Sequence, residues 1–294
     1  MHWHVLCYTS LHAPLPHVFP SILMASNKKF LVVTDLDATF LDHSYNWDEA
    51  RPAVARLREL GLPLVLNSSK TVAEMKDLAM ELGLQSPLVA ENGSLLAVPK
   101  QCTGDYSVEI KSLPRKEILD RAHNLRKKMG YKFEGFADWS DQELAERSGL
   151  SMIQSRRSLA RLATEPLLWK DSESQRLEFA DQLRIEGIRM LRGGRFWHLM
   201  GASDKVDGSA YALAYYQKLE PHTEWQVIAL GDSANDTAML EAAEIAVVIP
   251  HLDGAHITPK APRVVYAPFP ASKGWNVTIL SLLDECYGTA KTLN

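Results

Sequence analysis

The chain has 294 residues, of which 46% are hydrophobic and 23% are charged, and its formal net charge is -4. These values are typical of a globular protein, and the length suits either two domains or one domain with a large insertion. The sequence has no apolar run long enough to span a bilayer and no stripe dense in Lys and Arg, so we expect neither a membrane partner nor a nucleic-acid partner.

The cysteines and the first residues bear on where the protein works. Cys7, Cys102 and Cys286 stand far apart and form neither a metal-ligand spacing nor a disulfide framework, so we expect a cytoplasmic protein. Residues 1–25 are expected to be a disordered extension. The first 23 residues hold four histidines and three prolines but no Lys or Arg, so they lack the charged start of a secretory signal. We expect Met24 to be the functional start.

Strand-like apolar runs alternate with amphipathic helical segments at both ends of the chain, which is the pattern of parallel βαβ units. The first part predicts strands over 30–33, 62–66 and 88–90 and helices over 49–60 and 71–82. The last part predicts helices over 209–219 and 236–243 and strands over 227–230, 246–249 and 263–266. Both ends of the sequence are therefore expected to share one sheet.

Between these parts, from about Val98 to His198, the sequence changes to more charged and longer helices. The clearest helices cover 115–129 and 172–187, with short strands predicted at 131–133 and 167–169. We therefore predict an α/β fold with a Rossmann-like parallel-sheet core over 26–97 and 199–294 and an inserted α+β domain over 98–198.

Polar residues follow three of the predicted core strands, and ligands in open parallel sheets bind beyond the carboxyl ends of the strands. Asp35 and Asp37 follow the first strand, two residues apart in an extended segment, so both side chains can lie on the same side. Residues 67–70 follow the second strand, and residues 231–236 follow the strand at 227–230. Carboxylates crowded at one sheet edge repel one another unless a hard cation lies among them, so we expect Mg²⁺ there. A carboxylate beside Mg²⁺ is a competent nucleophile towards phosphorus.

The order of these motifs resembles that of haloacid dehalogenase-type phosphatases. Thr34-Asp35-Leu36-Asp37-Ala38-Thr39, Ser68, a lysine and Gly231-Asp232-Ser233-Ala234-Asn235-Asp236 carry the resemblance. It implies that Asp35 is the nucleophile and a metal ligand. It implies that Asp37 is the acid and base of the reaction and binds the metal through its backbone carbonyl. Ser68 would donate a hydrogen bond to the phosphoryl group.

The resemblance also assigns the remaining charged groups. Asp232 would bind Mg²⁺, Asp236 would complete or support the metal shell, and Lys205 would neutralise the phosphoryl group and the nucleophile. Two departures from the pattern stand out. The subfamily normally has Gly where this chain has Ala38, which would be strained if that residue needs a positive φ. Two residues separate Lys205 from Gly208, whereas in the family a glycine follows the lysine directly.

The inserted domain resembles the cap of the sugar-phosphate branch of this superfamily. Three stretches, 67–71, 90–93 and 193–201, are similar to those of mannosyl-3-phosphoglycerate phosphatases, which release phosphate from a glycosylated phosphoglycerate. The resemblance therefore implies a phosphorylated sugar-glycerate as the small-molecule substrate. The sequence does not indicate the oligomeric state.

Such a substrate carries a carboxylate and sugar hydroxyls beside its phosphate. Arg195, Lys70 and His198 are candidate cations or donors for the carboxylate. Glu91 and Asn92 are candidates for hydrogen bonds to the sugar. Each also has an ordinary structural interpretation, as a solvated charge, a strand residue or a turn.

Two other functions remain open at this stage. One is a phosphatase or phosphomutase for another sugar phosphate, such as glucosyl-3-phosphoglycerate or a disaccharide phosphate. The other is a non-catalytic sugar-phosphate-binding protein, suggested by Ala38 and by the spacing after Lys205.

Overall fold

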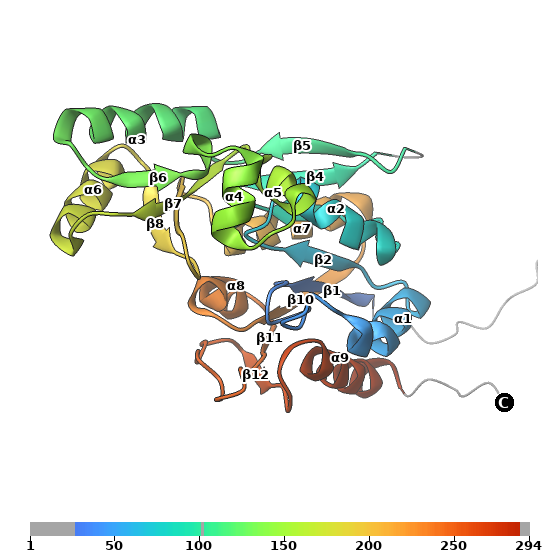
Figure 1. The fold of residues 1–294 in the computed structure, drawn as a ribbon. Coiled ribbons are helices and arrows are strands. Elements are labelled where there is room, and N and C mark those ends of the chain that lie inside the picture. The colour runs from blue at the N-terminus through green and yellow to red at the C-terminus, as the bar shows by residue number, and fades with distance from the viewer. Residues whose placement is uncertain (1–26, 101–102, 289–294) are drawn as a thin grey trace, which may run out of the picture.

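The computed structural model describes residues 27–100 and 103–288, so the expected extension over 1–25 lies outside the described residues. Its main sheet has eight strands in the order β12-β11-β10-β1-β2-β3-β4-β5 (Figure 1). The strands are β1 (Lys28–Thr34), β2 (Leu64–Asn67), β3 (Leu88–Ala90), β4 (Leu95–Pro99), β5 (Tyr106–Ile110), β10 (Glu224–Gly231), β11 (Ile245–Val248) and β12 (Arg263–Tyr266). Neighbours from β12 to β3 are parallel, whereas β4 and β5 are antiparallel.

Helices cover both faces of this sheet because its central strands are apolar on both sides. In β1, Phe30 and Val32 join one buried cluster, and Leu31 and Val33 join the other. The first cluster is covered by α1 (Arg51–Glu59), α2 (Val72–Glu81) and α9 (Ala271–Tyr287), and the second by α7 (Lys205–Leu219) and α8 (Thr237–Glu241). Short 3-10 turns, η1 (Asp48–Ala50) and η3 (Ala234–Asp236), precede α1 and α8. The core is thus a three-layer sandwich.

The inserted domain has its own antiparallel sheet, in the order β6-β7-β9-β8, at the left of Figure 1. Its strands are β6 (Phe133–Gly135), β7 (Thr164–Trp169), β8 (Arg189–Arg192) and β9 (Trp197–Met200). Its helices are α3 (Arg115–Met129), α4 (Asp141–Ser148), α5 (Met152–Leu159) and α6 (Glu173–Ile185), with a 3-10 turn η2 (Phe136–Asp138). The aromatic side chains of Phe133 and Phe179 lie in the core between this sheet and α3 and α6.

These observations confirm the α/β fold with a mostly parallel sheet and an inserted domain. The places where the chain leaves and re-enters the core sheet differ from the expected limits of 98 and 198. The β4–β5 hairpin belongs to the core sheet, and β9 belongs to the sheet of the insert. The chain therefore crosses between the two sheets after Ile110 and again after Met200. Among the described residues, no helix combines the length and apolar character needed to cross a bilayer.

Candidate active site

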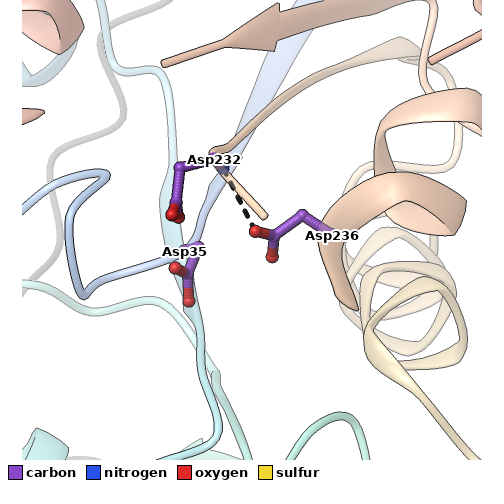
Figure 2. A group of neighbouring side chains, drawn as sticks. All are labelled: Asp35, Asp232 and Asp236. Atoms are coloured by element: carbon purple, nitrogen blue, oxygen red, sulfur yellow. Dashed lines mark hydrogen bonds between the residues drawn. The ribbon is translucent and has the colours of Figure 1, made fainter. Parts of the chain in front are cut away.

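Three carboxylates meet at the carboxyl ends of β1 and β10 (Figure 2). These two strands pair in parallel, with Thr34 opposite Leu230, and the backbone N–H of Asp35 donates to the Leu230 carbonyl at 3.0 Å. Asp35 therefore lies beside Asp232 and Asp236, although the chain positions are about two hundred residues apart. Each carboxylate offers an oxygen within 4.8 Å of the others, and all three residues are buried. The three carboxylates lie close together, as expected from their positions just after the ends of parallel strands.

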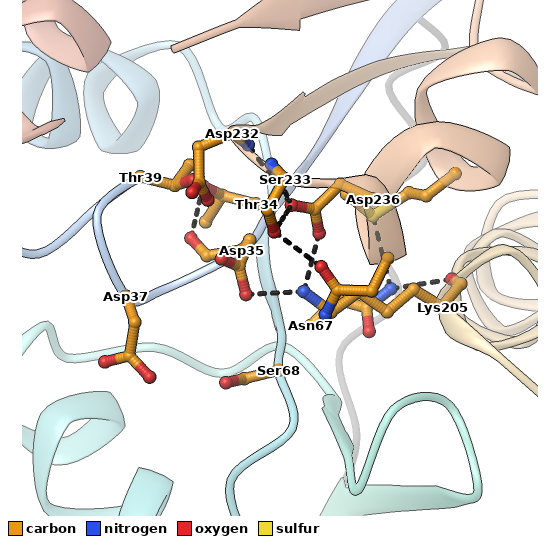
Figure 3. A network of polar contacts seen from close by, with 12 residues as sticks. Thr34, Asp35, Asp37, Thr39, Asn67, Ser68, Lys205, Asp232, Ser233 and Asp236 are labelled. Atoms are coloured by element: carbon orange, nitrogen blue, oxygen red, sulfur yellow. Dashed lines mark hydrogen bonds and ion pairs between the residues drawn. The ribbon is translucent and has the colours of Figure 1, made fainter. Parts of the chain in front are cut away.

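Lys205 lies inside this acidic cluster. Its Nζ is 2.6 Å from Asp35 Oδ1 and 2.6 Å from Asp236 Oδ1, and its side chain is 2% exposed (Figure 3). Burial disfavours the ammonium, but the Asp236 and Asp35 carboxylates outweigh it and raise the pKa of Lys205 above its ordinary value. Burial also raises the pKa of Asp35 well above its ordinary value, although Lys205 opposes the rise. Lys205 is therefore a permanent cation at the centre of the cluster.

The spacing after Lys205 has a structural explanation. Lys205 is the first residue of α7, and the preceding Asp204 caps the helix, accepting from the Val206 N–H at 3.1 Å. Gly208 lies one turn later, where an added Cβ would come within 2.2 Å of Val89. The helix start thus places Lys205 at the site and keeps a glycine at the contact with β3.

Asp236 has no free oxygen in this arrangement. Its Oδ1 binds Lys205, and its Oδ2 accepts from the backbone N–H groups of Asp232 and Ser233 at 3.1 and 3.0 Å. The Ser233 hydroxyl also donates to Oδ2 at 3.1 Å. Gly231 has no room for a side chain, because a Cβ there would come within 2.5 Å of the Asp236 Cβ. These contacts favour a supporting role for Asp236, which shapes the loop and orients Lys205. Asp35 and Asp232 are then the carboxylates left to bind a metal ion.

Two partners of Asp232 were missed by the sequence reasoning. The Thr39 hydroxyl donates to Asp232 Oδ1 at 2.7 Å, and His251 Nε2 lies 2.9 Å from Asp232 Oδ2. Burial, and then the nearby Asp236, raise the pKa of Asp232. His251 follows the end of β11, so the rule that identified Asp35 could also have found it. No comparable signal marks Thr39, apart from its place in the first motif.

Asp37 lies outside the carboxylate cluster, as Figure 3 shows. Its side chain is 49% exposed and its Oδ1 pairs with Lys70 Nζ at 2.9 Å. Burial disfavours the Lys70 ammonium, but Asp37 outweighs it and raises the pKa of Lys70. Lys70 therefore orients Asp37 in this structure, while the predicted role of Asp37 as a metal ligand depends on its backbone carbonyl. Ser68 is 1% exposed, and its hydroxyl accepts from the Lys70 N–H at 3.3 Å.

Ala38 has a φ of 60°, which is the left-handed conformation that the sequence comparison raised as a possibility. The turn is closed by the Leu36 carbonyl, which accepts from the N–H groups of Thr39, Phe40 and Leu41. Ala38 therefore keeps the turn that a glycine would make, at a cost in backbone strain.

A cavity of about 810 Å³ opens beside the cluster, between the core and the inserted domain. Asp35, Asp37, Lys205 and Asp232 line its core end, and Arg189, Arg192, Gly193 and His198 line the opposite end. Among the five predicted substrate residues, Asn92 and His198 line this cavity. The volume is in the range of cavities that hold a molecule of drug size.

Glu91 and Arg195 have positions that differ from the predicted contacts with substrate. Glu91 is fully buried, and its carboxylate accepts from the N–H groups of Leu162 and Ala163 at 2.8 and 3.0 Å and from the Thr164 hydroxyl at 2.7 Å. It thus joins the core to the inserted domain. Arg195 is exposed and donates through Nη2 to the Ser148 carbonyl at 2.6 Å, outside the cavity lining. Both side chains therefore form hydrogen bonds with other parts of the protein and do not face the cavity.

His198 lines the cavity but is not a cation. Burial, and then the neighbouring Arg161, lower the pKa of His198 to about 3. The imidazole is therefore neutral near neutral pH and can act only as a neutral donor or acceptor. Its Nδ1 has no hydrogen-bond partner among the described residues.

Comparisons with known proteins agree with this architecture. Residues 32–142 match the family model of haloacid dehalogenase-like hydrolases. The fold is similar to a Thermoplasma acidophilum protein (15% identity, TM-score 0.62, 88% of this chain and 98% of that chain). It is also similar to a haloacid dehalogenase-like hydrolase from Bacteroides thetaiotaomicron (17%, 0.61, 87% and 100%).

A third similar structure is a second Bacteroides thetaiotaomicron protein, described among the phosphatases of the haloalkanoate enzyme superfamily (14% identity, TM-score 0.63, 91% of this chain and 98% of that chain). At these identities the structures establish a common fold. Residues 32–142 are therefore similar to haloacid dehalogenase-like hydrolases, and the chain shares its fold with solved structures described by that name.

Proposed function

We propose that this protein is a haloacid dehalogenase-like hydrolase and that it acts as a magnesium-dependent phosphatase with Asp35 as its nucleophile. The observation that carries the proposal is the buried cluster of Asp35, Asp232 and Asp236, which contains Lys205 and faces the cavity. Three carboxylates and one ammonium leave a surplus of negative charge, so an anionic phosphate would be repelled without a further cation. A small-molecule substrate in the cytoplasm, without a nucleic-acid or membrane partner, is part of the same proposal.

The oxygen donors of this cluster suit Mg²⁺. Asp35 and Asp232 would hold the ion with the backbone carbonyl of Asp37, while Asp236 supports them through the loop and Lys205. When bound, Mg²⁺ would neutralise charge on the phosphoryl oxygens, which is what phosphoryl transfer chiefly requires.

The chain's own residues account for the two halves of the reaction. A carboxylate oxygen of Asp35 attacks phosphorus, and the bond from phosphorus to the leaving oxygen breaks while Asp37 gives that oxygen a proton. Water then attacks the phosphorus of the aspartyl phosphate, Asp37 takes the proton of the water, and phosphate leaves with Asp35 regenerated. Lys205 and Ser68 would stabilise charge on the phosphoryl group.

For the substrate we propose mannosyl-3-phosphoglycerate, which would be converted to mannosylglycerate and phosphate. The three sequence stretches at 67–71, 90–93 and 193–201 support this choice, as does a cavity of about 810 Å³, which suits a sugar joined to a phosphoglycerate. Another sugar phosphate is the second candidate, because the residues of the catalytic cluster do not identify the leaving group. A non-catalytic role is disfavoured by the complete set of carboxylates that phosphoryl transfer would use, Asp35, Asp37, Asp232 and Asp236.

A panel of phosphate esters tests the proposal. The purified protein should release phosphate in the presence of Mg²⁺, fastest from mannosyl-3-phosphoglycerate, and a chelator should abolish release. Asp35→Asn should remove activity, while Asp181→Asn, which changes an exposed aspartate on α6, should not. Full activity of Asp35→Asn would end the assignment of the nucleophile, and a faster ester in the panel would replace the proposed substrate.

A further inference from the structure

The inserted domain presents an uncommitted cation to the cavity. Arg192 ends β8 and lines the cavity wall opposite the carboxylate cluster. Its side chain is exposed and makes no hydrogen bond or ion pair with any residue that the structure describes; its guanidinium lies 5.1 Å from the centre of the Trp197 ring. Arg189, at the start of the same strand, is engaged, because it donates to the carbonyls of Gly201 and Ser203 at 3.1 and 2.6 Å.

Two polar side chains elsewhere in the cavity lining, Asn92 and His198, also have atoms without hydrogen-bond partners among the described residues. Asn92, which is 9% exposed, lines the cavity with an Oδ1 that has no hydrogen-bond partner among the described residues. His198 is neutral, and its Nδ1 likewise has no hydrogen-bond partner among the described residues. Gly193 lies against the His198 ring, where an added Cβ would come within 2.7 Å of Nε2. The turn after Arg192 therefore packs closely on His198. A ligand with hydroxyl groups and an anionic group would complement these side chains.

The two ends of the cavity differ in charge. The core end holds Asp35, Asp232 and Asp236 with one ammonium, so it accepts an anion only together with a cation. At the other end, a second anionic group on the substrate meets a guanidinium that can bind it through two parallel hydrogen bonds. The arginine that the sequence suggested for this role, Arg195, is held by the Ser148 carbonyl.

We propose that Arg192 is a specificity-determining residue that binds an anionic group, either a carboxylate or a second phosphate, on the leaving-group part of the substrate. The inference rests on the proposed phosphatase function and adds a chemical requirement to it. Phosphate esters whose leaving group carries a negative charge are preferred over neutral ones of similar size, and the preference depends on Arg192.

Matched pairs of substrates measure this preference. For a carboxylate the pair is 3-phosphoglycerate and glycerol 3-phosphate, and for a second phosphate it is glucose 1,6-bisphosphate and glucose 6-phosphate. We expect wild-type kcat/KM to favour the charged member of at least one pair. Arg192→Met should lower that ratio about 10- to 100-fold, which corresponds to a loss of about 1.4–2.7 kcal/mol in charge-assisted hydrogen bonding. Arg195→Met is the matched control and should leave the ratio unchanged.

Further variants and measurements separate the possible failures. Arg192→Lys, which keeps the charge, should retain part of the preference. A wild-type enzyme without preference in either pair, or an Arg192→Met variant that keeps the wild-type ratio, would overturn the inference while phosphatase activity stands. If the wild type hydrolyses none of the four esters, calorimetric Kd values for the same pairs decide. A difference in Kd that Arg192→Met removes supports the anion site even then, and equal Kd values within both pairs contradict it.

Discussion

Replacing Lys205 by Met tests whether the acidic cluster is organised around this lysine. Lys205 is 2% exposed and bonds Asp35 and Asp236 at 2.6 Å each, so the substitution leaves buried carboxylates without their shared counter-charge. Breaking a buried ion pair by removing one partner costs about 3–5 kcal/mol of stability. We expect a loss of this size in the free energy of unfolding in chelator. Since Mg²⁺ would replace part of the missing positive charge, the loss should be smaller in Mg²⁺.

The same variant should lose activity, because in the proposed mechanism Lys205 also neutralises the phosphoryl group. Loss of one such electrostatic contact lowers kcat by about 10²–10³. Urea unfolding with chelator or Mg²⁺ and a phosphate-release assay measure the two effects. Lys218→Met, in the exposed last turn of the same helix, is the control and should change neither quantity. A Lys205→Met variant with wild-type stability in chelator and wild-type kcat would refute the reasoning about this cluster.

Two further substitutions test single features of the site. Ala38→Gly should raise the free energy of unfolding by about 0.5–1 kcal/mol. The left-handed backbone costs alanine about 1–2 kcal/mol, and the greater entropy of glycine in the unfolded chain offsets only part of this gain. Ala180→Gly, inside the helix α6, is the control and should lower the free energy of unfolding by about 1 kcal/mol. Equal effects at the two positions in urea unfolding would contradict the role of φ. His198→Gln should reduce the sensitivity of stability to acid. In the folded protein the pKa of His198 is about 3, so the imidazole stays neutral, whereas the unfolded imidazole takes up a proton below about pH 6.5. The free energy of unfolding therefore falls as the pH drops below 6.5, by about 2 kcal/mol at pH 5. An unchanged slope between pH 6.5 and 5 would show that His198 does not contribute.

The core could be predicted from the sequence because its signals are local. An apolar strand followed at once by a carboxylate is visible at Asp35 and at Asp232, and parallel pairing of β1 with β10 then brings the two together. The positive φ of Ala38 and the position of Lys205 could be anticipated from the motifs in the same way. Helix α9 was not predicted. It begins after Pro270 without a side-chain cap, although Trp275 and Ile279 bury its apolar face.

The cavity wall could not be predicted because it depends on contacts between segments far apart in sequence. Arg192 and Arg195 are both exposed arginines near one turn, and only the tertiary fold places the Ser148 carbonyl beside Arg195 and the cavity beside Arg192. Glu91 follows a strand as Asp35 does. Its side chain nevertheless lies at the contact between the core and residues 162–164 of the inserted domain, where backbone N–H groups donate to the carboxylate. Residue type and strand position do not determine such choices.

If the protein is the phosphatase that we propose, the distribution of charge in the cavity separates the two tasks that it must perform. Asp35, Asp232 and Lys205 come from the core strands and the start of α7, and they hold the groups that would react with phosphorus. Arg192 and His198 come from the inserted sheet and line the other end of the cavity, where they would meet the group to which the phosphate is attached. Since no strand is shared between the two sheets, the turn between β8 and β9 can change without moving the carboxylates. Substitutions in that turn should therefore alter the choice among phosphate esters, whereas substitutions in the core cluster should alter the rate for every ester alike.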